Sequence, residues 1–273
     1  MPELPEVETI ARGLAKRVTG DLIESVWIGE RKQPLLSSAR EIAATLEGSR
    51  LTKIRRIGKH IAIDLERNGG RRKTDNAQWI VHLGMTGRVL VAEPDQQVEK
   101  HTHLIAKLES GREIRFVDPR MFGKLKVVRE AFQAPGREPL EISFDDFAKL
   151  FRGRKTPIKS ALLNQKLLSG VGNIYADEAL ARAGVRPRRR AAAVTQVELR
   201  KLYDGLQQVL KEAIAAGGSS INDYVDSDGN EGFFQIQHRV YGREGEPCLT
   251  CKTPVKRIVI SGRSAHYCPK CQR

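Results

Sequence analysis

The four cysteines of the chain all lie in its last 26 residues, where their spacing indicates a metal site. Cys248 and Cys251 form one C-x2-C pair, and Cys268 and Cys271 form a second pair after an interval of 16 residues. Each pair can bring two thiolates to one metal ion from a tight turn, and two pairs complete a closed tetrahedron. A redox motif would need only one pair, and a disulfide framework would spread cysteines along a secreted chain. The spacing therefore predicts one structural Zn2+ ion as the cofactor.

The segment between the two cysteine pairs predicts a β-hairpin that turns at Ser261, Gly262 and Arg263. Arg263 would then lie at the tip of a small module stiffened by the metal, where a guanidinium can contact a phosphate. From the residues alone, a solvated surface charge explains Arg263 equally well.

The second residue, Pro2, could also do chemistry, because removal of Met1 would leave a secondary amine at the start of the chain. An α-amino group has a pKa of about 8, so a fraction is unprotonated near neutral pH and can attack an electrophilic sugar carbon. Glu3 and Glu6 follow closely enough to donate or accept protons. A proline with acidic neighbours is also ordinary at the start of a helix, and the residues alone favour this simpler interpretation.

The charge of the chain indicates a polyanionic partner. Its 47 Lys and Arg residues exceed its 33 Asp and Glu residues, which gives a net charge of +14. Nucleic acid is the partner that most naturally balances such an excess. An anionic membrane is a weaker alternative, because no long apolar run and no basic helix beside an anchor are found. The first residues do not form a secretory signal, so we expect an intracellular protein.

The hydrophobic pattern indicates how these groups are positioned. Apolar residues at spacings of three and four predict a helix over 3–18 that ends at Gly20. Short alternating runs separated by turn residues predict the strands of a β-sandwich or barrel between about 22 and 130. Within that region, residues 68–76 are expected to form an exposed hairpin loop.

From residue 144 the pattern becomes helical, and Thr195 with Glu198 predicts a capping box on the last long helix. Residues 217–240 contain few apolar side chains and predict a long functional loop. The expected organisation is a β-sandwich domain at 1–131, a linker at 132–143, a helical domain at 144–218, a loop at 219–240 and a zinc finger at 241–273.

Five motifs occur in order along the chain: MPELPEVET, HLGMTG, DPRMFG, GVGNIYADE and the terminal CxxC…GRSAHYCPKC. Together they resemble the bacterial formamidopyrimidine-DNA glycosylase (Fpg or MutM) family over essentially residues 1–273. The resemblance implies an α+β multidomain fold, with an N-terminal catalytic β-sandwich domain, a helix–two-turn–helix domain and a C-terminal zinc-ribbon finger. It also implies a DNA-formamidopyrimidine glycosylase with apurinic or apyrimidinic site lyase activity. Such an enzyme excises 8-oxoguanine and formamidopyrimidines from double-stranded DNA and then cleaves the strand by β,δ-elimination.

The resemblance further implies roles for four residues. Pro2 resembles the nucleophile that displaces the base at C1′ and becomes a Schiff base, and Glu3 resembles the acid/base that protonates the sugar ring oxygen. Lys59, in the motif RIGKH, matches a lysine assigned to proton transfer in β-elimination. Arg263 matches a finger arginine that supports δ-elimination by gripping phosphates. A base inside a duplex is out of reach, so the nucleotide must be flipped out while the flanking phosphates are held.

Other matching residues are expected to contact the DNA. Met85, Arg120 and Phe122 match the residues that fill the gap left by the flipped base, Phe122 as a wedge and Arg120 as a partner of the orphaned cytosine. From the residues alone, a core position is the preferred interpretation for such Met and Phe side chains. The matching DNA-binding positions are His101, Arg120, Arg154, Lys159 and Asn173.

Alternatives remain for one residue role, for the lesion preference and for the class of protein. Asn173 could be a simple N-cap, since its side chain suits that position. Residues 219–240 resemble the family's lesion-capping loop, but Asn222 and Met121 stand where basic residues are common, which affects the expected lesion preference. Endonuclease VIII, a related enzyme for oxidised pyrimidines, begins PEGPE, whereas this chain has Leu4. A further alternative is a non-catalytic zinc-ribbon DNA-binding protein, and the presence of all the candidate catalytic residues argues against it. We expect a monomer that binds damaged DNA and no membrane, in the bacterial cytoplasm near the nucleoid.

Overall fold

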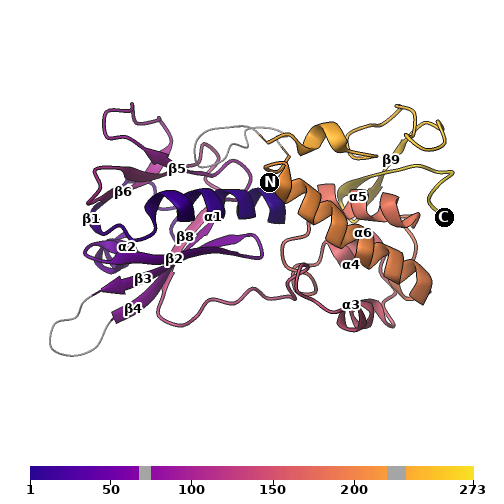
Figure 1. Ribbon diagram of the computed structural model, residues 1–273, viewed down its shortest axis with the longest axis horizontal. Helices are drawn as coiled ribbons and strands as arrows, with labels where there is room; N and C mark the ends of the chain where they lie inside the picture. Colours follow the sequence, from indigo (N-terminus) through magenta and orange to yellow (C-terminus); the bar gives the residue numbers. More distant parts are fainter. Residues whose placement is uncertain (68–74, 220–231) are drawn as a thin grey trace. The chain divides into compact units, whose positions relative to one another are not determined.

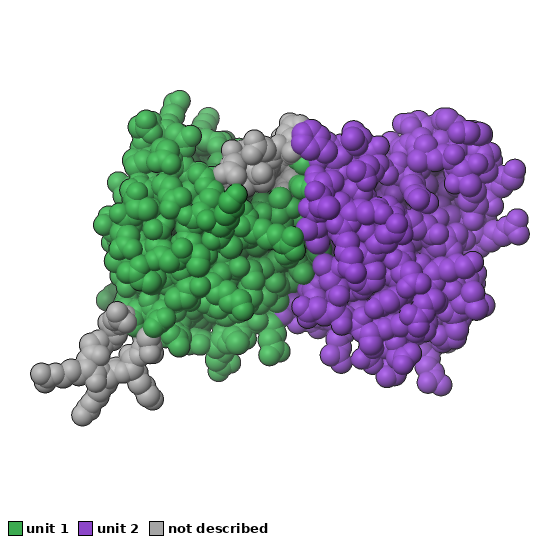
Figure 2. Space-filling view, in the orientation of Figure 1, with its two compact units in different colours: residues 1–133, 217–232 green, residues 134–216, 233–273 purple. Residues whose placement is uncertain are grey.

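The computed structural model describes residues 1–67, 75–219 and 232–273 (Figure 1). The chain divides into two compact units, Met1–Gln133 with Gly217–Gly232, and Ala134–Ala216 with Phe233–Arg273 (Figure 2). Within the described ranges, no helix combines the length and the apolar character needed to span a bilayer. Most of the predicted hairpin loop at 68–76 and Asn222 lie outside the described residues.

The first unit contains two four-stranded sheets, and neighbouring strands within each sheet are antiparallel (Figure 1). One sheet has the strand order β1-β6-β7-β5 and the other β2-β3-β4-β8. Apolar side chains of both sheets belong to one hydrophobic core, which confirms the predicted β-sandwich. The strands are β1 (Ile23–Ile28), β2 (Arg50–Ile57), β3 (His60–Arg67), β4 (Asp75–His82), β5 (Arg88–Ala92), β6 (Thr102–Leu108), β7 (Glu113–Val117) and β8 (Lys124–Val128).

The predicted first helix is confirmed as α1 (Leu4–Val18). Its apolar stripe is buried in the core of the first unit, and the helix contacts β2, β3 and β5. Glu3 is the N-cap, and Glu6 completes a capping box with it. Gly20 follows the C-cap with φ of 96°, a left-handed conformation that favours glycine. The amphipathic spacing and both helix ends therefore agree with the sequence pattern.

A short helix, α2 (Ala39–Leu46), interrupts the region that was expected to consist of strands. Ser38 caps it by accepting a hydrogen bond from the backbone of Glu41, and Ile42 and Leu46 are buried. No strand was assigned to these residues, and the helix was missed. A Ser-x-x-Glu signature, which is typical of a helix start, marks it in the sequence.

The second unit is mainly helical and ends in a small antiparallel hairpin. Thr195 and Glu198 form the predicted capping box, and a hydrogen bond from Arg189 lowers the pKa of Glu198 to about 2. The elements are α3 (Phe144–Phe151), α4 (Ile158–Leu162), α5 (Asn173–Ala183), η1 (Ala191–Ala193), α6 (Gln196–Ala215), η2 (Phe234–Gln237), β9 (Lys256–Ile260) and β10 (Arg263–Tyr267).

Candidate functional site

The N-terminal residues with predicted chemistry lie at the buried start of α1. Pro2 is buried, and Glu3 is only 3% exposed. Glu6 uses both of its carboxylate oxygens structurally: Oε2 accepts from the Glu3 backbone nitrogen at 2.8 Å, and Oε1 accepts from the Ser219 nitrogen at 2.9 Å. Gly218 lies against Glu6 so closely that an added Cβ would come within 3.1 Å of it. Glu6 therefore connects Gly218 and Ser219 to the start of α1, a role that the sequence did not indicate.

Lys59 lies in the two-residue turn between β2 and β3 and is 7% exposed. Arg56 connects this turn to α1, because its Nε pairs with Glu8 at 2.8 Å and its Nη1 donates to the carbonyl of Gly58 at 3.1 Å. The start of α1 and the lysine turn are thus held at the same end of the first unit. Sequence reasoning missed Arg56, although it belongs to the same RIGK motif as Lys59.

Two histidines lie next to the lysine turn. The ring centroids of His60 and His82 are 4.9 Å apart, and burial lowers the pKa of both rings, that of His60 to about 4. The nearby Lys59 and Lys124 charges contribute further to the lowered pKa of His82. The Nδ1 atom of His82 accepts a hydrogen bond from the Gly84 nitrogen at 3.2 Å. Both rings are therefore neutral at pH 7, which leaves the positive charge to the lysines.

The residues predicted to fill the base gap lie on two loops of the first unit and are exposed. Met85 is 45% exposed on the loop after β4, and Phe122 is 49% exposed on the loop before β8. The guanidinium of Arg120 stacks over the Phe122 ring at 4.8 Å from its centroid. Met121, between them, has φ of 56°, the left-handed region that a non-glycine residue adopts at a cost. Because the side chains of Met85 and Phe122 are both exposed to solvent, the interpretation that they belong to the hydrophobic core is wrong.

In the second unit, the structure brings Asn173 next to the finger. Asn173 is the first residue of α5, and its Nδ2 donates to the Ser264 hydroxyl, adjacent to the exposed Arg263, at 3.2 Å. Among the described residues, its buried Oδ1 has no hydrogen-bond partner. The N-cap is Gly172, so the N-cap alternative for Asn173 was wrong. The positive end of a helix dipole beside an exposed arginine suits a phosphate group.

Lys159 does not lie on the surface. Its side chain is 0% exposed, its Nζ forms an ion pair with Asp177 Oδ1 at 2.6 Å, and it donates to the carbonyl of Ser264. Lys159 therefore holds β10, which carries Arg263, and its predicted contact with DNA stays a prediction. Of the other predicted contacts, Arg154 is exposed and His101 is half-buried.

Two adjacent buried carboxylates of α5 anchor the finger. Asp177 accepts from the backbone nitrogen of His266 at 2.9 Å. Glu178 accepts from three successive backbone nitrogens, those of Arg239, Val240 and Tyr241, at 2.9 to 3.0 Å. Both carboxylates are 0% exposed. Sequence reasoning missed them, although acidic residues inside an apolar helical run are unusual unless they are paired.

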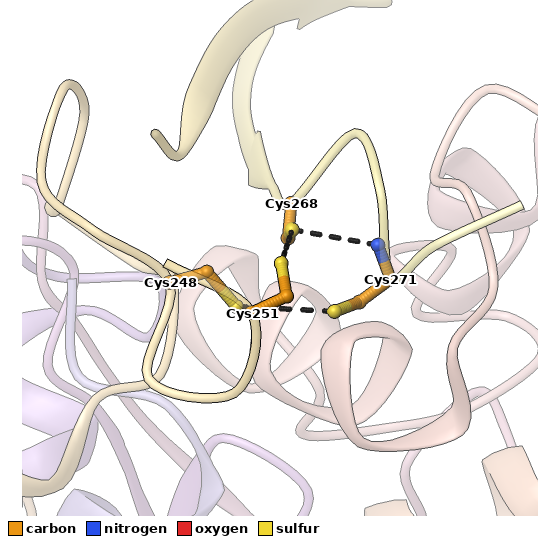
Figure 3. Close-up of side chains that lie close together, drawn as sticks. All are labelled: Cys248, Cys251, Cys268 and Cys271. Carbon is orange, nitrogen blue, oxygen red and sulfur yellow. Dashed lines mark hydrogen bonds between the residues drawn. The ribbon is translucent and has the colours of Figure 1, made fainter. Parts of the chain in front are cut away.

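The four cysteines are brought together as predicted (Figure 3). Their sulfur atoms all lie within 4.8 Å of one another, and the Cys251 and Cys268 sulfurs are 3.4 Å apart. That separation excludes a disulfide, whose sulfurs are about 2.05 Å apart, and is close to the edge of a tetrahedron with Zn–S bonds of about 2.3 Å. A hydrogen bond with Cys251, together with burial, raises the pKa of the Cys271 thiol to about 12 when no cation is present.

The donor set fits a single structural Zn2+ ion, held by Cys248, Cys251, Cys268 and Cys271 with no position left open. The hairpin between the pairs turns at Ser261 and Gly262, which have φ of 47° and 75°. Two successive residues with positive φ are typical of the tight turn that matches the twist of a hairpin. When bound, the metal supplies no chemistry of its own in such a closed site and stabilises the finger that presents Arg263.

Three family models match the chain in sequence. The formamidopyrimidine-DNA glycosylase N-terminal domain matches residues 1–125, the formamidopyrimidine-DNA glycosylase H2TH domain matches 135–225, and the zinc finger found in FPG and IleRS matches 245–273. A formamidopyrimidine-DNA glycosylase of Solibacter usitatus is 46% identical over 280 residues, with full coverage of both chains.

Solved structures agree with this result. The MutM (Fpg) protein of Thermus thermophilus is similar with a TM-score of 0.86 and 40% identity, over 99% of this chain and 98% of that one. A MutM structure in complex with DNA that contains carbocyclic 8-oxo-G is similar with a TM-score of 0.89 and 33% identity, over 100% of both chains. The likeness extends over all three sequence regions and over the whole fold, so the chain belongs to the formamidopyrimidine-DNA glycosylase family.

Proposed function

We propose that this protein is a bifunctional DNA glycosylase and lyase that removes oxidised purines, chiefly 8-oxoguanine and formamidopyrimidines, from double-stranded DNA. The position of Pro2 carries the proposal: it is buried directly before the N-cap of α1, in a family named for formamidopyrimidine excision. The MutM relative solved with DNA that contains carbocyclic 8-oxo-G supports the choice of lesion. We further propose that the protein acts as a monomer in the bacterial cytoplasm, on nucleoid DNA.

The chemistry begins once Met1 has been removed. The secondary amine of Pro2 attacks C1′ of the everted nucleotide, and the bond from C1′ to the damaged base breaks. Glu3 protonates the sugar ring oxygen, the ring opens, and an iminium remains between the proline nitrogen and C1′. Lys59 assists loss of a C2′ proton, which breaks the bond to the 3′ phosphate. Arg263 holds the flanking phosphate charge while the second elimination breaks the bond on the 5′ side.

The remaining predicted residues hold the DNA in this scheme. Arg154 and Asn173 bind phosphates, and His101 assists from the first unit. Met85, Arg120 and Phe122 occupy the gap in the duplex, with Phe122 as the wedge. The phosphates on both sides of the lesion must be held in place, and the net charge of +14 supplies the electrostatic attraction for this.

Borohydride trapping on a duplex with one 8-oxoguanine tests the proposal. The wild-type protein is expected to form a covalent complex, and the variant Pro2→Gly, whose N-terminal amine is primary, is expected to form much less. Pro5→Ala is the matched control. Pro5 is also a buried proline at the start of α1, but its nitrogen is part of a peptide bond and cannot act as a free amine. Undiminished trapping by Pro2→Gly would refute the nucleophile. A panel of duplexes with oxidised purines and pyrimidines opposite each base distinguishes the proposed lesion class from the endonuclease VIII class.

A further inference from the structure

Asp118, the first residue of the DPRMFG motif, lies at the centre of the loops that carry Met85 and Phe122, and the proposed function gives it no role. The side chain is 0% exposed. Its Oδ1 accepts hydrogen bonds from the Thr86 hydroxyl at 2.6 Å and from the Arg120 nitrogen at 3.2 Å, and its Oδ2 accepts from the Gly123 nitrogen at 2.7 Å. One buried carboxylate thus holds both loops.

The backbone of Asp118 adds a third segment to this connection. Its nitrogen donates to the carbonyl of His101 at 2.9 Å, and its carbonyl lies 2.9 Å from the Nε2 atom of His103 on β6. The predicted DNA contact at His101 and the predicted gap-filling residues therefore meet at one residue. A buried carboxylate with so many donors is costly to disturb, because each lost acceptor leaves a donor without a partner.

The two loops also touch through their backbones, at the glycines of the motifs HLGMTG and DPRMFG. Gly84 has φ of 64°, and an added Cβ there would lie 2.5 Å from both the Phe122 carbonyl carbon and the Gly123 nitrogen. No side chain separates the loops at this point. The carboxylate of Asp118 fixes their positions from inside, and the glycine contact fixes their spacing.

We propose that Asp118 is a positioning residue that makes the Met85 loop and the Arg120–Phe122 loop a single rigid element for insertion into the duplex. Met85 immediately precedes Thr86, and Phe122 immediately precedes Gly123, so each inserting side chain is one residue from a donor to Asp118. Pre-positioned groups of this kind need a supporting shell that fixes them to within a fraction of an ångström. The inference rests on the proposed function, since it assigns these loops to the gap in the duplex.

The test compares Asp118→Asn with two other substitutions. An amide has one acceptor oxygen in place of two, so at least one of the three donors in Asp118→Asn faces an NH2 group. Thr86→Val removes only the connection to the Met85 loop. Asp64→Asn is the matched control, because Asp64 lies on β3 of the same unit and its carboxylate bonds to Arg55 and Gln78, in neither loop.

Three measurements apply to each variant. The first is hydrogen exchange of the Gly123 amide in the protein alone. The second is the fluorescence of 2-aminopurine placed opposite 8-oxoguanine, which reports whether the gap is filled. The third compares single-turnover excision from that duplex with cleavage of a single-stranded oligonucleotide bearing an abasic site, which offers no gap to fill.

We expect Asp118→Asn to expose the Gly123 amide to exchange, to weaken the 2-aminopurine response and to slow duplex excision by about 10- to 100-fold. Cleavage of the single strand stays unchanged. Thr86→Val has a smaller effect, and the double variant is no slower than Asp118→Asn, since both changes disrupt one connection. Asp64→Asn leaves all three measurements as in the wild type.

Equal losses on both substrates, or equal behaviour of Asp118→Asn and Asp64→Asn, would overturn the inference. Additive effects of Asp118→Asn and Thr86→Val would do the same. If Asp118→Asn does not fold, Thr86→Val still has to slow duplex excision while sparing the single strand. If the wild type cleaves neither substrate, the proposed function fails. The exchange of the Gly123 amide then still decides whether Asp118 couples the loops.

Discussion

The ion pair between Lys159 and Asp177 allows a quantitative test of how the finger is held. Both side chains are 0% exposed, and the two charged atoms are 2.6 Å apart. Lys159→Met preserves most of the side-chain volume but removes the ammonium, so the carboxylate keeps only its contacts to His266. Breaking a buried pair by removing one partner costs about 3–5 kcal/mol, because a charge is left buried without compensation.

Urea unfolding can locate this loss, because the two tryptophans, Trp27 and Trp79, both lie in the first unit. Their fluorescence reports that unit, whereas zinc release to a coloured chelator reports the second. With a denaturant dependence of about 2 kcal/mol per M, a loss of about 3–5 kcal/mol lowers the zinc-release midpoint by about 1.5–2.5 M. The unfolding transition seen by tryptophan fluorescence serves as the internal control, and its urea midpoint is expected to be unchanged.

The double variant Lys159→Met with Asp177→Asn sharpens the test. It removes both charges, and the amide oxygen can still accept from His266, so it is expected to be more stable than Lys159→Met alone. An unchanged zinc-release midpoint in Lys159→Met, or a double variant whose loss equals the sum of the two single losses, would refute the reasoning. Because Lys159 also donates to Ser264, which follows Arg263, folded Lys159→Met is expected to bind DNA more weakly.

Further expectations concern the metal, the pH and the salt concentration. Cys271→Ser should purify with less than one zinc per chain and bind DNA poorly, and a full metal content measured by atomic emission would contradict the four-cysteine site. His60 has a pKa of about 4 in the folded protein against 6.5 unfolded, so the unfolded state binds more protons between these values. The tryptophan-detected stability should therefore fall as the pH decreases from 6.5 towards 4, and less so in His60→Gln; equal pH profiles would count against a neutral His60. DNA affinity should fall steeply with salt, with a log–log slope smaller by about 1 in Arg263→Gln, whereas a flat response would exclude phosphate binding.

Much of the architecture could be predicted from local patterns. The spacing in α1 predicts which face is buried, and Thr195 with Glu198 predicts where α6 begins. These signals are local because helix periodicity and capping depend on residues three or four positions apart. The helix α2 was missed because its short apolar pattern lies among strands, although Ser38 marked its start.

The candidate site was predictable only in part. The family motifs, not the residue types, pointed to Pro2 and Lys59 as candidates, but they did not point to Arg56, which connects the turn of Lys59 to α1. The burial of Lys159 was not predictable, because a lysine is ordinarily exposed. Burial of its ammonium becomes tolerable only beside Asp177, and that partner is distant in sequence.

The cysteine spacing by itself determined the metal site, because four thiolates in two tight turns can satisfy one zinc ion wherever the finger lies. Motifs in order determined the family. Only the tertiary structure decided which of the polar and motif residues are exposed and which are buried and hold the fold. Met85 and Phe122 face solvent because Asp118 occupies the interior between their loops, and Asp177 and Glu178 are buried because the finger supplies their donors. Whether a charge is buried depends on partners that the fold brings from distant positions, and local sequence does not contain that information.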